Sequence, residues 1–289
     1  MPSARDIRRR IKSVTSTAQI TRAMQMVAAS KMGKAQEAAL TTRPFAQLLY
    51  RIQRHATTHA GDFTHPLLEV RPVRKRAVIL FGTDKGLCGA LNNNLFRLAA
   101  QFDPATTVFI AAGKRAAEFI AEMHGQLVAE FTFSDAPRFD EARPIAALAS
   151  DLFLKREVDQ VQVVATRFVN TMTQEPDVFE FLPIGEIKEL KMVDAASDAV
   201  APDVTQFVFE FSAGEVLRYL FGHYLNIYVY RVMLEAKASE QSARMVAMKN
   251  ATDNATGLIR DLTLGYNHLR QGNITKEMLE IAGGQLDND

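Results

Sequence analysis

The chain has 289 residues, a formal net charge of +1 and one cysteine, and these values already exclude several classes of protein. The length allows one or two domains with a substantial core. The near balance of charge provides no overall field that would draw the chain to nucleic acid or acidic lipid. A single thiol, Cys88, can form neither an internal disulfide nor a thiolate metal cluster, which favours a reducing compartment. No apolar run in the sequence approaches the roughly 20 residues of a membrane-spanning helix.

Basic residues are concentrated near the N-terminus, where residues 1–36 contain one acid, Asp6. This Arg-rich, acid-poor start is similar to a mitochondrial presequence. Its hydrophobic pattern continues without a break into the first predicted helix, so we expect no cleaved leader. The basic residues are interpreted as a solvated helix face or as an electrostatic contact with an acidic partner. They are Arg5, Arg8, Arg9, Arg10, Lys12, Arg22, Lys31 and Lys34.

The first predicted element is a long helix in the N-terminal arm, where no proline occurs between Pro2 and Pro44. Proline in a helix interior costs about 3 kcal/mol, so its absence permits an uninterrupted helix. Apolar and small residues recur in alternating steps of three and four, which predicts a helix that packs along a partner helix. These positions are Ile7, Ile11, Val14, Ala18, Thr21, Gln25, Ala28, Met32, Ala35 and Ala39.

The middle of the chain predicts alternating strands and helices. Apolar, β-branched runs bounded by turn residues indicate strands. Between these runs the apolar residues have helical spacing. This alternation predicts a mostly parallel sheet in a three-layer α/β domain. The expected strands are 76–82, 106–113, 126–133 and 161–169, with 178–184 as a candidate fifth, and the expected helices are 91–102, 114–124 and 141–156. Residues 188–204 are expected to be a linker.

The segment FGTDKGLCGALNNNLF (81–96) joins the first strand to a helix through three glycines. Many α/β proteins bind a phosphate at such a junction. The segment matches neither the P-loop pattern nor the dinucleotide pattern G-x-G-x-x-G, and Asp84 would repel an anion. We therefore interpret the glycines as residues of a tight strand-to-helix turn. Cys88 has no neighbouring base in the sequence and is predicted to be a small buried thiol.

Catalytic and metal-binding signals are weak elsewhere in the sequence. His55 and His59 have the i, i+4 spacing of a metal pair on a helix. No third ligand with suitable spacing is evident, although His65 follows in a predicted loop, so a solvated helix end is the preferred interpretation. The sequence therefore predicts no catalytic residue, no metal and no cofactor.

The last predicted element is a helix from about Ser212 to Ile281, roughly 105 Å long at 1.5 Å per residue. No proline follows Pro202, and a seam of mostly apolar positions continues for more than seven heptads. A helix of this length must lie along a partner helix or enter another protein. An antiparallel coiled coil with the N-terminal arm is the preferred arrangement, and two helices of an ordinary bundle are the alternative. The seam positions are Leu217, Leu220, Tyr224, Ile227, Arg231, Leu234, Ala238, Gln241, Met245, Met248, Thr252, Ala255, Ile259, Leu262, Tyr266 and Leu269.

Four segments together resemble the gamma subunit of the F-type rotary ATP synthase, in the family's order along the chain. They are ITRAMQMVAASKM (20–32), TDKGLCGALNNNLF (83–96), ASEQSARMVAMKNATDNA (238–255) and YNHLRQGNITKEMLEIAGG (266–284). The resemblance implies an α/β fold class with a long antiparallel coiled coil of the N- and C-terminal helices. It assigns residues 1–60 and 206–289 to the coiled coil, and residues 61–205 to a Rossmann-like three-layer foot domain.

The resemblance also implies a function without bond chemistry in this chain. The coiled coil would be the central rotor shaft inside a hexamer of three alpha and three beta subunits. The foot would lie, with the epsilon subunit, on the membrane ring of c subunits. Rotation would couple proton flow through that ring to ATP synthesis at beta-subunit sites. The resemblance implies no cofactor, no nucleic acid and no direct small-molecule substrate, and a peripheral position on the cytoplasmic face of a bacterial inner (plasma) membrane.

Several residues carry an implied role because they match the family's motifs. Arg270, Gln271, Thr275 and Glu277 would contact beta-subunit loops. Met24 and Arg244 would lie on the shaft near acidic beta-subunit segments and influence coupling. For Met24 and Arg244, an ordinary place in the helical seam stays open as the alternative.

The chain departs from the family at its C-terminus and in its cysteines. It ends in GGQLDND, where family members commonly carry small apolar residues. It lacks the cysteine pair of the chloroplast form, which speaks against thiol switching.

Two other classes of function are alternatives to the rotor shaft. A small-molecule enzyme in the α/β domain predicts nucleotide binding by the isolated chain. A basic coiled-coil protein on nucleic acid predicts steeply salt-dependent DNA binding, and the near-neutral total charge argues against it.

Overall fold

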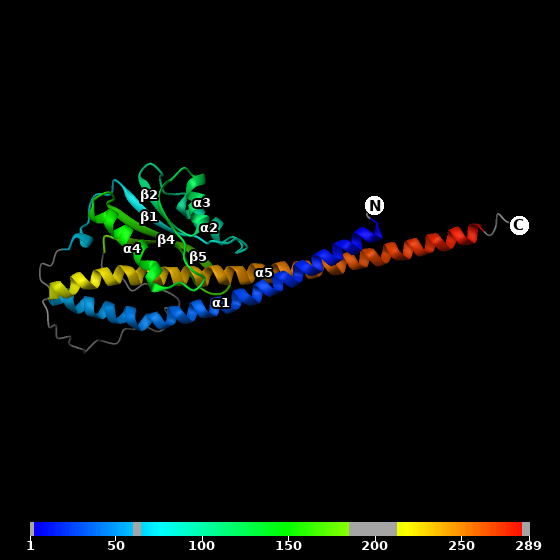
Figure 1. Ribbon diagram of the computed structural model, residues 1–289, viewed down its shortest axis with the longest axis horizontal. Coiled ribbons are helices and arrows are strands. Elements are labelled where there is room, and N and C mark those ends of the chain that lie inside the picture. Colours follow the sequence, from blue (N-terminus) through cyan, green and yellow to red (C-terminus); the bar gives the residue numbers. More distant parts are fainter. Residues whose placement is uncertain (1–2, 60–64, 185–212, 285–289) are drawn as a thin grey trace. The chain divides into compact units, whose positions relative to one another are not determined.

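The computed structural model describes the backbone of residues 3–59, 65–184 and 213–284 (Figure 1). The chain divides into two compact units. One, the paired-end unit, joins Met1–Val27 to Met245–Asp289, and the other, the central unit, is Ala28–Arg244. The expected linker and the acidic C-terminal tail lie outside the described residues. The division of the chain into three sequence domains stays a proposal.

Two long helices form the ends of the chain, as the proline-free arms predict. Helix α1 comprises Ala4–His59, and helix α5 comprises the 72 residues Ala213–Gly284, close to the predicted bounds. Helix α1 continues through Pro44, where the sequence interpretation ended the proline-free arm. Proline removes one backbone donor, and the loss of one bond within a helix of 56 residues leaves the other turns intact.

The predicted seams are turned away from solvent in both units. Every described seam position of α1, from Ile7 to Ala39, and of α5, from Leu220 to Leu269, is buried or half-buried. In the paired-end unit the two segments lie side by side in opposite directions, and the hydroxyls of Thr21 and Thr252 are 2.7 Å apart (Figure 1). The predicted antiparallel pairing is confirmed.

The central unit contains a five-stranded sheet in the order β3-β2-β1-β4-β5. The first four strands in this order are parallel, and β5 is antiparallel to β4. The mostly parallel sheet is confirmed, and the candidate fifth strand begins four residues earlier than expected, as the second half of a hairpin with β4. The strands are β1 (Arg76–Phe81), β2 (Thr107–Ala112), β3 (Gln126–Phe131), β4 (Gln160–Phe168) and β5 (Gln174–Leu182).

Helices cover both faces of this sheet. On one face, α2 (Leu91–Ala99) and α3 (Lys114–Glu122) pack against alternate residues of β1, including Val78 and Leu80. On the other face, Ile79 and its neighbours two residues away meet α4 (Phe139–Leu154). The short 3-10 helix η1 (Pro66–Leu68) precedes β1. The strands β1–β5 with α2, α3 and α4 are called the α/β domain below.

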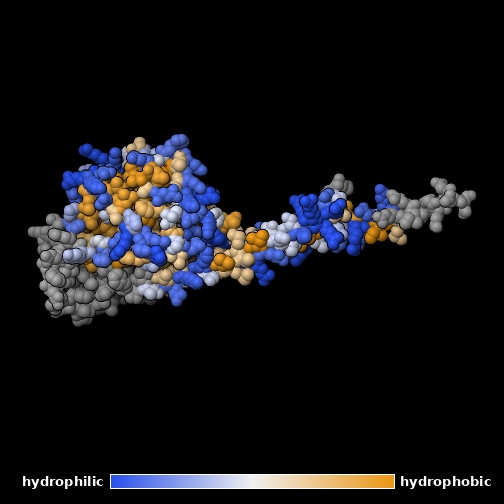
Figure 2. All heavy atoms as spheres, viewed as in Figure 1, coloured by the Kyte–Doolittle hydropathy of each residue, from blue (hydrophilic) through white to orange (hydrophobic). Residues whose placement is uncertain are grey.

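The helical layer that contains α4 also contains part of α5. The sequence interpretation assigned α5 to the coiled coil alone. Residues Phe221, Leu225, Val229 and Met233 of α5 belong to the same buried cluster as α4 and the sheet. They lie on a different face from the seam, so this part of α5 is apolar nearly all round and is buried on more than one side. On the face of the α/β domain shown in Figure 2, hydrophilic residues border an apolar area.

Candidate functional site

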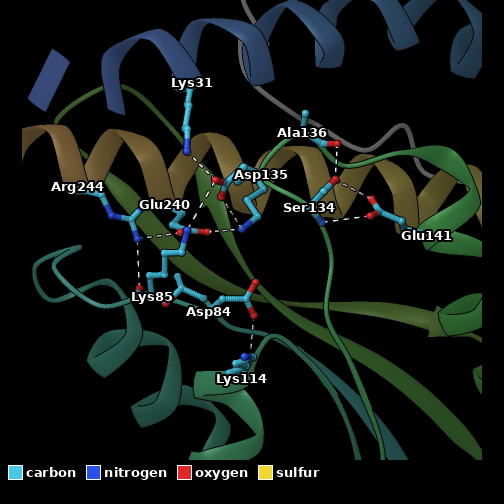
Figure 3. Close-up of polar contacts among 12 residues, drawn as sticks. Lys31, Asp84, Lys85, Lys114, Ser134, Asp135, Ala136, Glu141, Glu240 and Arg244 are labelled. Atoms are coloured by element: carbon cyan, nitrogen blue, oxygen red, sulfur yellow. Dashed lines mark hydrogen bonds and ion pairs between the residues drawn. The ribbon is translucent and has the colours of Figure 1, made fainter. Parts of the chain in front are cut away.

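The glycine turn, residues 82–90, packs closely against other residues of the chain. A Cβ at Gly82 would lie 2.9 Å from the Cβ of Ala116, so the turn requires glycine at this close approach. The carboxylate of Asp84 accepts a hydrogen bond of 3.0 Å from the backbone N–H of Lys114 (Figure 3). The carbonyl of Thr83 accepts one of 2.9 Å from the backbone N–H of Arg115. These contacts join the glycine turn to N–H groups in the first turn of α3. The geometry supports a structural turn.

Cys88 is a buried free thiol, as predicted. Burial raises the pKa of the Cys88 thiol, although the positive charge of Arg244 opposes that shift. Its neighbour Asn92 donates to the hydroxyl of Thr83 at 2.7 Å and lies 3.6 Å from the sulfur. A raised pKa keeps the thiol neutral, which disfavours a nucleophilic role.

A run of polar and charged side chains lies buried in α5, beside the glycine turn. Burial of charged groups is costly unless they are paired. Glu240 pairs with two cations at once, at 2.9 Å from the Nζ of Lys237 and at 2.8 Å from the guanidinium of Arg244 (Figure 3). Lys237 is only 2% exposed, so these pairs are shielded from water. The buried polar residues are Glu235, Lys237, Ser239, Glu240, Gln241, Ser242 and Arg244.

Arg244 joins this helix to the glycine turn. Its Nη2 donates to the carbonyls of Lys85 and Gly86, at 3.2 Å each, and to Glu240. The side chain is 9% exposed. Two features that the sequence analysis singled out separately are therefore in contact. The role of Arg244 toward beta subunits stays a prediction.

Sequence analysis missed the partners of Arg244, although Glu240 and Arg244 have the i, i+4 spacing of a helical ion pair. It also missed two serines that fix α5 to the end of the β4–β5 hairpin. The hydroxyl of Ser239 donates to the carbonyl of Thr166 at 3.3 Å, and that of Ser242 donates to Thr171 at 2.8 Å. Both serines lie in the quoted segment 238–255, but their partners are about 70 residues away, so the sequence did not reveal these contacts.

Glu235 completes the attachment by accepting a hydrogen bond of 3.0 Å from the backbone N–H of Phe168. Burial raises its pKa from 4.5 to about 7, although that hydrogen bond and the charges of Arg231 and Arg167 oppose the shift. The folded chain therefore binds more protons than the unfolded chain between pH 4.5 and about pH 7. It follows that Glu235 makes the fold less stable as the pH rises through this window.

Glu235→Gln is expected to flatten the pH dependence of the unfolding free energy. Glutamine is uncharged at every pH and keeps a carbonyl oxygen for the Phe168 N–H, so the variant should gain stability relative to wild type as the pH rises. Urea unfolding at about pH 5 and about pH 8 measures the effect. Glu180→Gln, at an exposed position of β5, is the matched control. Equal slopes for wild type and Glu235→Gln would contradict this role.

The remaining predicted contact residues lie in the paired-end unit. Met24 is half-buried on α1, whereas Arg270, Gln271 and Thr275 are exposed on α5. The hydroxyl of Thr275 donates to the carbonyl of Gln271 at 3.0 Å. The side chain of Glu277 lies outside the described residues. Three of the four residues expected to contact beta-subunit loops are thus accessible to a partner, and the contacts themselves stay predictions.

The described part of the chain contains neither a clustered metal site nor a membrane-spanning helix. Among its His, Cys, Asp and Glu side chains, no group of three or more could hold a metal ion. The side chains of His55 and His59 lie outside that part. Within the same residues, no helix is both long and apolar enough to span a membrane.

Comparison with known proteins places the chain among rotary ATP synthase components. A family model described as ATP synthase matches residues 3–286. The ATP synthase gamma chain of Opitutus terrae is 44% identical over 291 residues, covering 99% of both chains. That of Methylacidiphilum infernorum is 42% identical over 290 residues, with the same coverage.

Solved structures share the fold. A chain of the Euglena gracilis mitochondrial ATP synthase, in a structure of OSCP/F1/c-ring, matches with a TM-score of 0.69 and 23% identity, covering 98% of this chain and 94% of that one. A chain from the rotor of the same organism's enzyme matches with a TM-score of 0.65 and 20% identity, covering 94% and 98%.

Proposed function

This chain belongs to the ATP synthase gamma chain family and is a non-catalytic central-stalk subunit of that complex, and we propose that it acts as the rotor shaft. The resemblance drawn from four sequence segments is confirmed. In the proposal, the helical pair turns inside a ring of three alpha and three beta subunits. The α/β domain is the foot, which meets the epsilon subunit and the c-ring at the cytoplasmic face of a bacterial inner membrane. Proton flow through the c-ring drives the rotation.

The observation that carries the proposal is the attachment of α5 to the α/β domain. In the central unit, α5 lies in the hydrophobic core of that domain and is also tied to it through Glu235, Ser239 and Arg244. A force applied to the domain therefore acts directly on α5. A rotor needs this property, because torque generated at the foot has to reach the helix that faces the catalytic subunits.

Exposed apolar residues of the paired-end unit support a surrounding partner. Leu258, Leu264, Ile274 and Met278 of α5 are among its exposed large apolar side chains. Burial of such apolar side chains against a partner is favourable, because it removes apolar surface from water. An enclosing ring of alpha and beta subunits would cover them.

Reconstitution with alpha and beta subunits tests the proposal. The chain should co-elute with them as one complex, and ATP hydrolysis should be accompanied by rotation of a bead attached to the α/β domain. The isolated chain should neither hydrolyse ATP nor bind it tightly. Failure to co-elute, or micromolar binding of Mg-ATP to the pure chain in calorimetry, would contradict the proposal.

The double variant Arg270→Ala with Gln271→Ala is expected to lower both ATP synthesis and ATP hydrolysis by the assembled enzyme. A guanidinium forms bidentate, charge-assisted bonds to a carboxylate, and truncation of one partner of such a desolvated pair typically costs about 2–5 kcal/mol. Loss of the Gln271 hydrogen bond adds about 1 kcal/mol. Steady-state hydrolysis and proton-driven synthesis are the measurements.

Arg260→Ala is the matched control for that double variant, because Arg260 is an exposed arginine of the same helix. It should retain more activity than the double variant. Wild-type rates for Arg270→Ala with Gln271→Ala would mean that torque passes elsewhere along the shaft.

A further inference from the structure

One carboxylate of the central unit, that of Asp135, lies among three lysines from three different segments. Its Oδ2 is 2.6 Å from the Nζ of Lys31 on α1 and 4.0 Å from the Nζ of Lys85 in the glycine turn. Its Oδ1 is 3.8 Å from the Nζ of Lys237 on α5. Figure 3 shows Lys31 and Lys85 approaching the carboxylate from separate segments of the chain. Asp135 itself belongs to the connection between β3 and α4.

The three contacts differ in strength. Lys31 makes the shortest contact, and its hydrogen bond is the main reason that the pKa of Asp135 is lowered. Lys237 is almost fully buried, also pairs with Glu240, and lies 4.8 Å from the centre of the Phe133 ring. Lys85 is 74% exposed, so water screens its charge most, whereas the side chains of Lys31 and Asp135 are 37% and 38% exposed and are screened less. The stronger contacts of Asp135 are therefore those with Lys31 on α1 and Lys237 on α5.

The turn that presents Asp135 is itself held in place. Glu141, in the first turn of α4, accepts hydrogen bonds from the backbone N–H of Ser134 at 3.2 Å and of Arg138 at 2.7 Å. The Ser134 hydroxyl lies 3.1 Å from Glu141 and donates to the carbonyl of Ala136 at 2.6 Å (Figure 3). A residue fixed on both sides by such bonds keeps its geometry under load, as a positioning residue requires.

An ion pair to the α/β domain matters more for the attachment of α1 than for that of α5. In the central unit α5 is anchored by the hydrophobic core and by several hydrogen bonds to the sheet. The buried cluster that brings α1 to the sheet consists of Ala35, Phe168 and Ala238. Among the ion pairs of the described residues, the one that joins α1 to the α/β domain is Lys31–Asp135.

We propose that Asp135 is a positioning residue that ties α1, through Lys31, and α5, through Lys237, to the α/β domain, so that both helices turn with the domain. The inference rests on the proposed rotor function. Without the carboxylate, Lys31 and Lys85 would lose this partner, and Lys237 would keep its pair with Glu240 alone. Helix α1 would then shift relative to the domain, and part of each rotation step would be lost as slippage.

Asp135→Asn in the assembled enzyme, reconstituted in vesicles, tests the inference. The variant keeps the shape of the side chain and removes its charge. We expect ATP hydrolysis to stay above about half of the wild-type rate, while protons pumped per ATP fall at least about twofold, with a larger loss against a high proton gradient. Asp140→Asn is the control, because Asp140 lies nearby on α4 in an exposed pair with Arg138 and should keep the wild-type ratio.

A cleavable cross-link separates a tie from a general folding effect. Lys31→Cys with Asp135→Cys can be bridged by a reducible bifunctional thiol reagent, since the remaining thiol, Cys88, is buried. Bridging should restore the pumping ratio, and reduction should lower it again in the same sample. A ratio that does not respond to the bridge would overturn the inference.

The outcomes distinguish this inference from the rotor proposal. If the wild-type complex neither assembles nor pumps, the rotor proposal fails. If wild type pumps and Asp135→Asn pumps with the same ratio, only the tie is wrong. If Asp135→Asn does not assemble, hydrogen exchange of the full-length chain decides. Faster exchange over residues 28–41 of α1 with unchanged sheet strands supports the tie, and unchanged exchange in α1 overturns it.

Discussion

Ala238→Pro is expected to lower the free energy of unfolding by at least about 3 kcal/mol. Ala238 lies inside α5, is 3% exposed, and packs with Ala35 of α1 and Phe168 of β4. Proline cannot donate the backbone hydrogen bond, and its ring would clash with the carbonyl of Leu234, one turn earlier. The close contact with Ala35 leaves little room for the helix to bend away. Denaturant unfolding followed by circular dichroism measures the loss.

Ala238→Ser separates the effect on the backbone from the effect on packing. Serine is almost the same size as alanine and keeps the N–H, so its loss should be much smaller. In the assembled enzyme, Ala238→Pro should also impair assembly or coupling. If the proline variant were as stable as the serine variant, the cost assigned to a proline at this buried position of α5 would be wrong.

Glu240→Ala is expected to destabilise the chain by about 3–5 kcal/mol, because it leaves buried cations without their carboxylate. Lys237 would retain Asp135 at 3.8 Å, and Arg244 would retain the two carbonyls of the glycine turn. Neither arrangement replaces a carboxylate that contacts both cations within 3 Å. The expected result is a large fall in the urea midpoint with little change in its slope.

Glu118→Ala is the matched control for Glu240→Ala. Glu118 pairs with Arg115 at 2.8 Å on α3, but both side chains are about half exposed. Exposed pairs of this kind contribute roughly 0–1 kcal/mol. A similar loss for Glu240→Ala and Glu118→Ala would show that the buried network adds no more than a surface pair.

The local sequence pattern was sufficient to predict the helices and strands of this fold. The strands β1 to β4 and the long helix α5 were predicted close to their observed places, because the spacing of apolar residues and the absence of proline act over a few neighbouring residues. The seams were predicted for the same reason, since a heptad pattern states which side of a helix meets a partner. The four quoted segments were sufficient to identify the family.

Only the tertiary structure decided which distant segments of the chain contact one another. The sequence placed α5 in the coiled coil alone, whereas Phe221, Val229 and Met233 pack it into the α/β domain as well. Arg244 meets Lys85 across 159 residues, and Asp135 meets Lys31 across 104. A charge pattern cannot distinguish a solvated lysine such as Lys85 from a buried one such as Lys237. The cost of burying a charge depends on the partner that surrounds it in space, and that partner comes from distant segments which only the folded chain brings together.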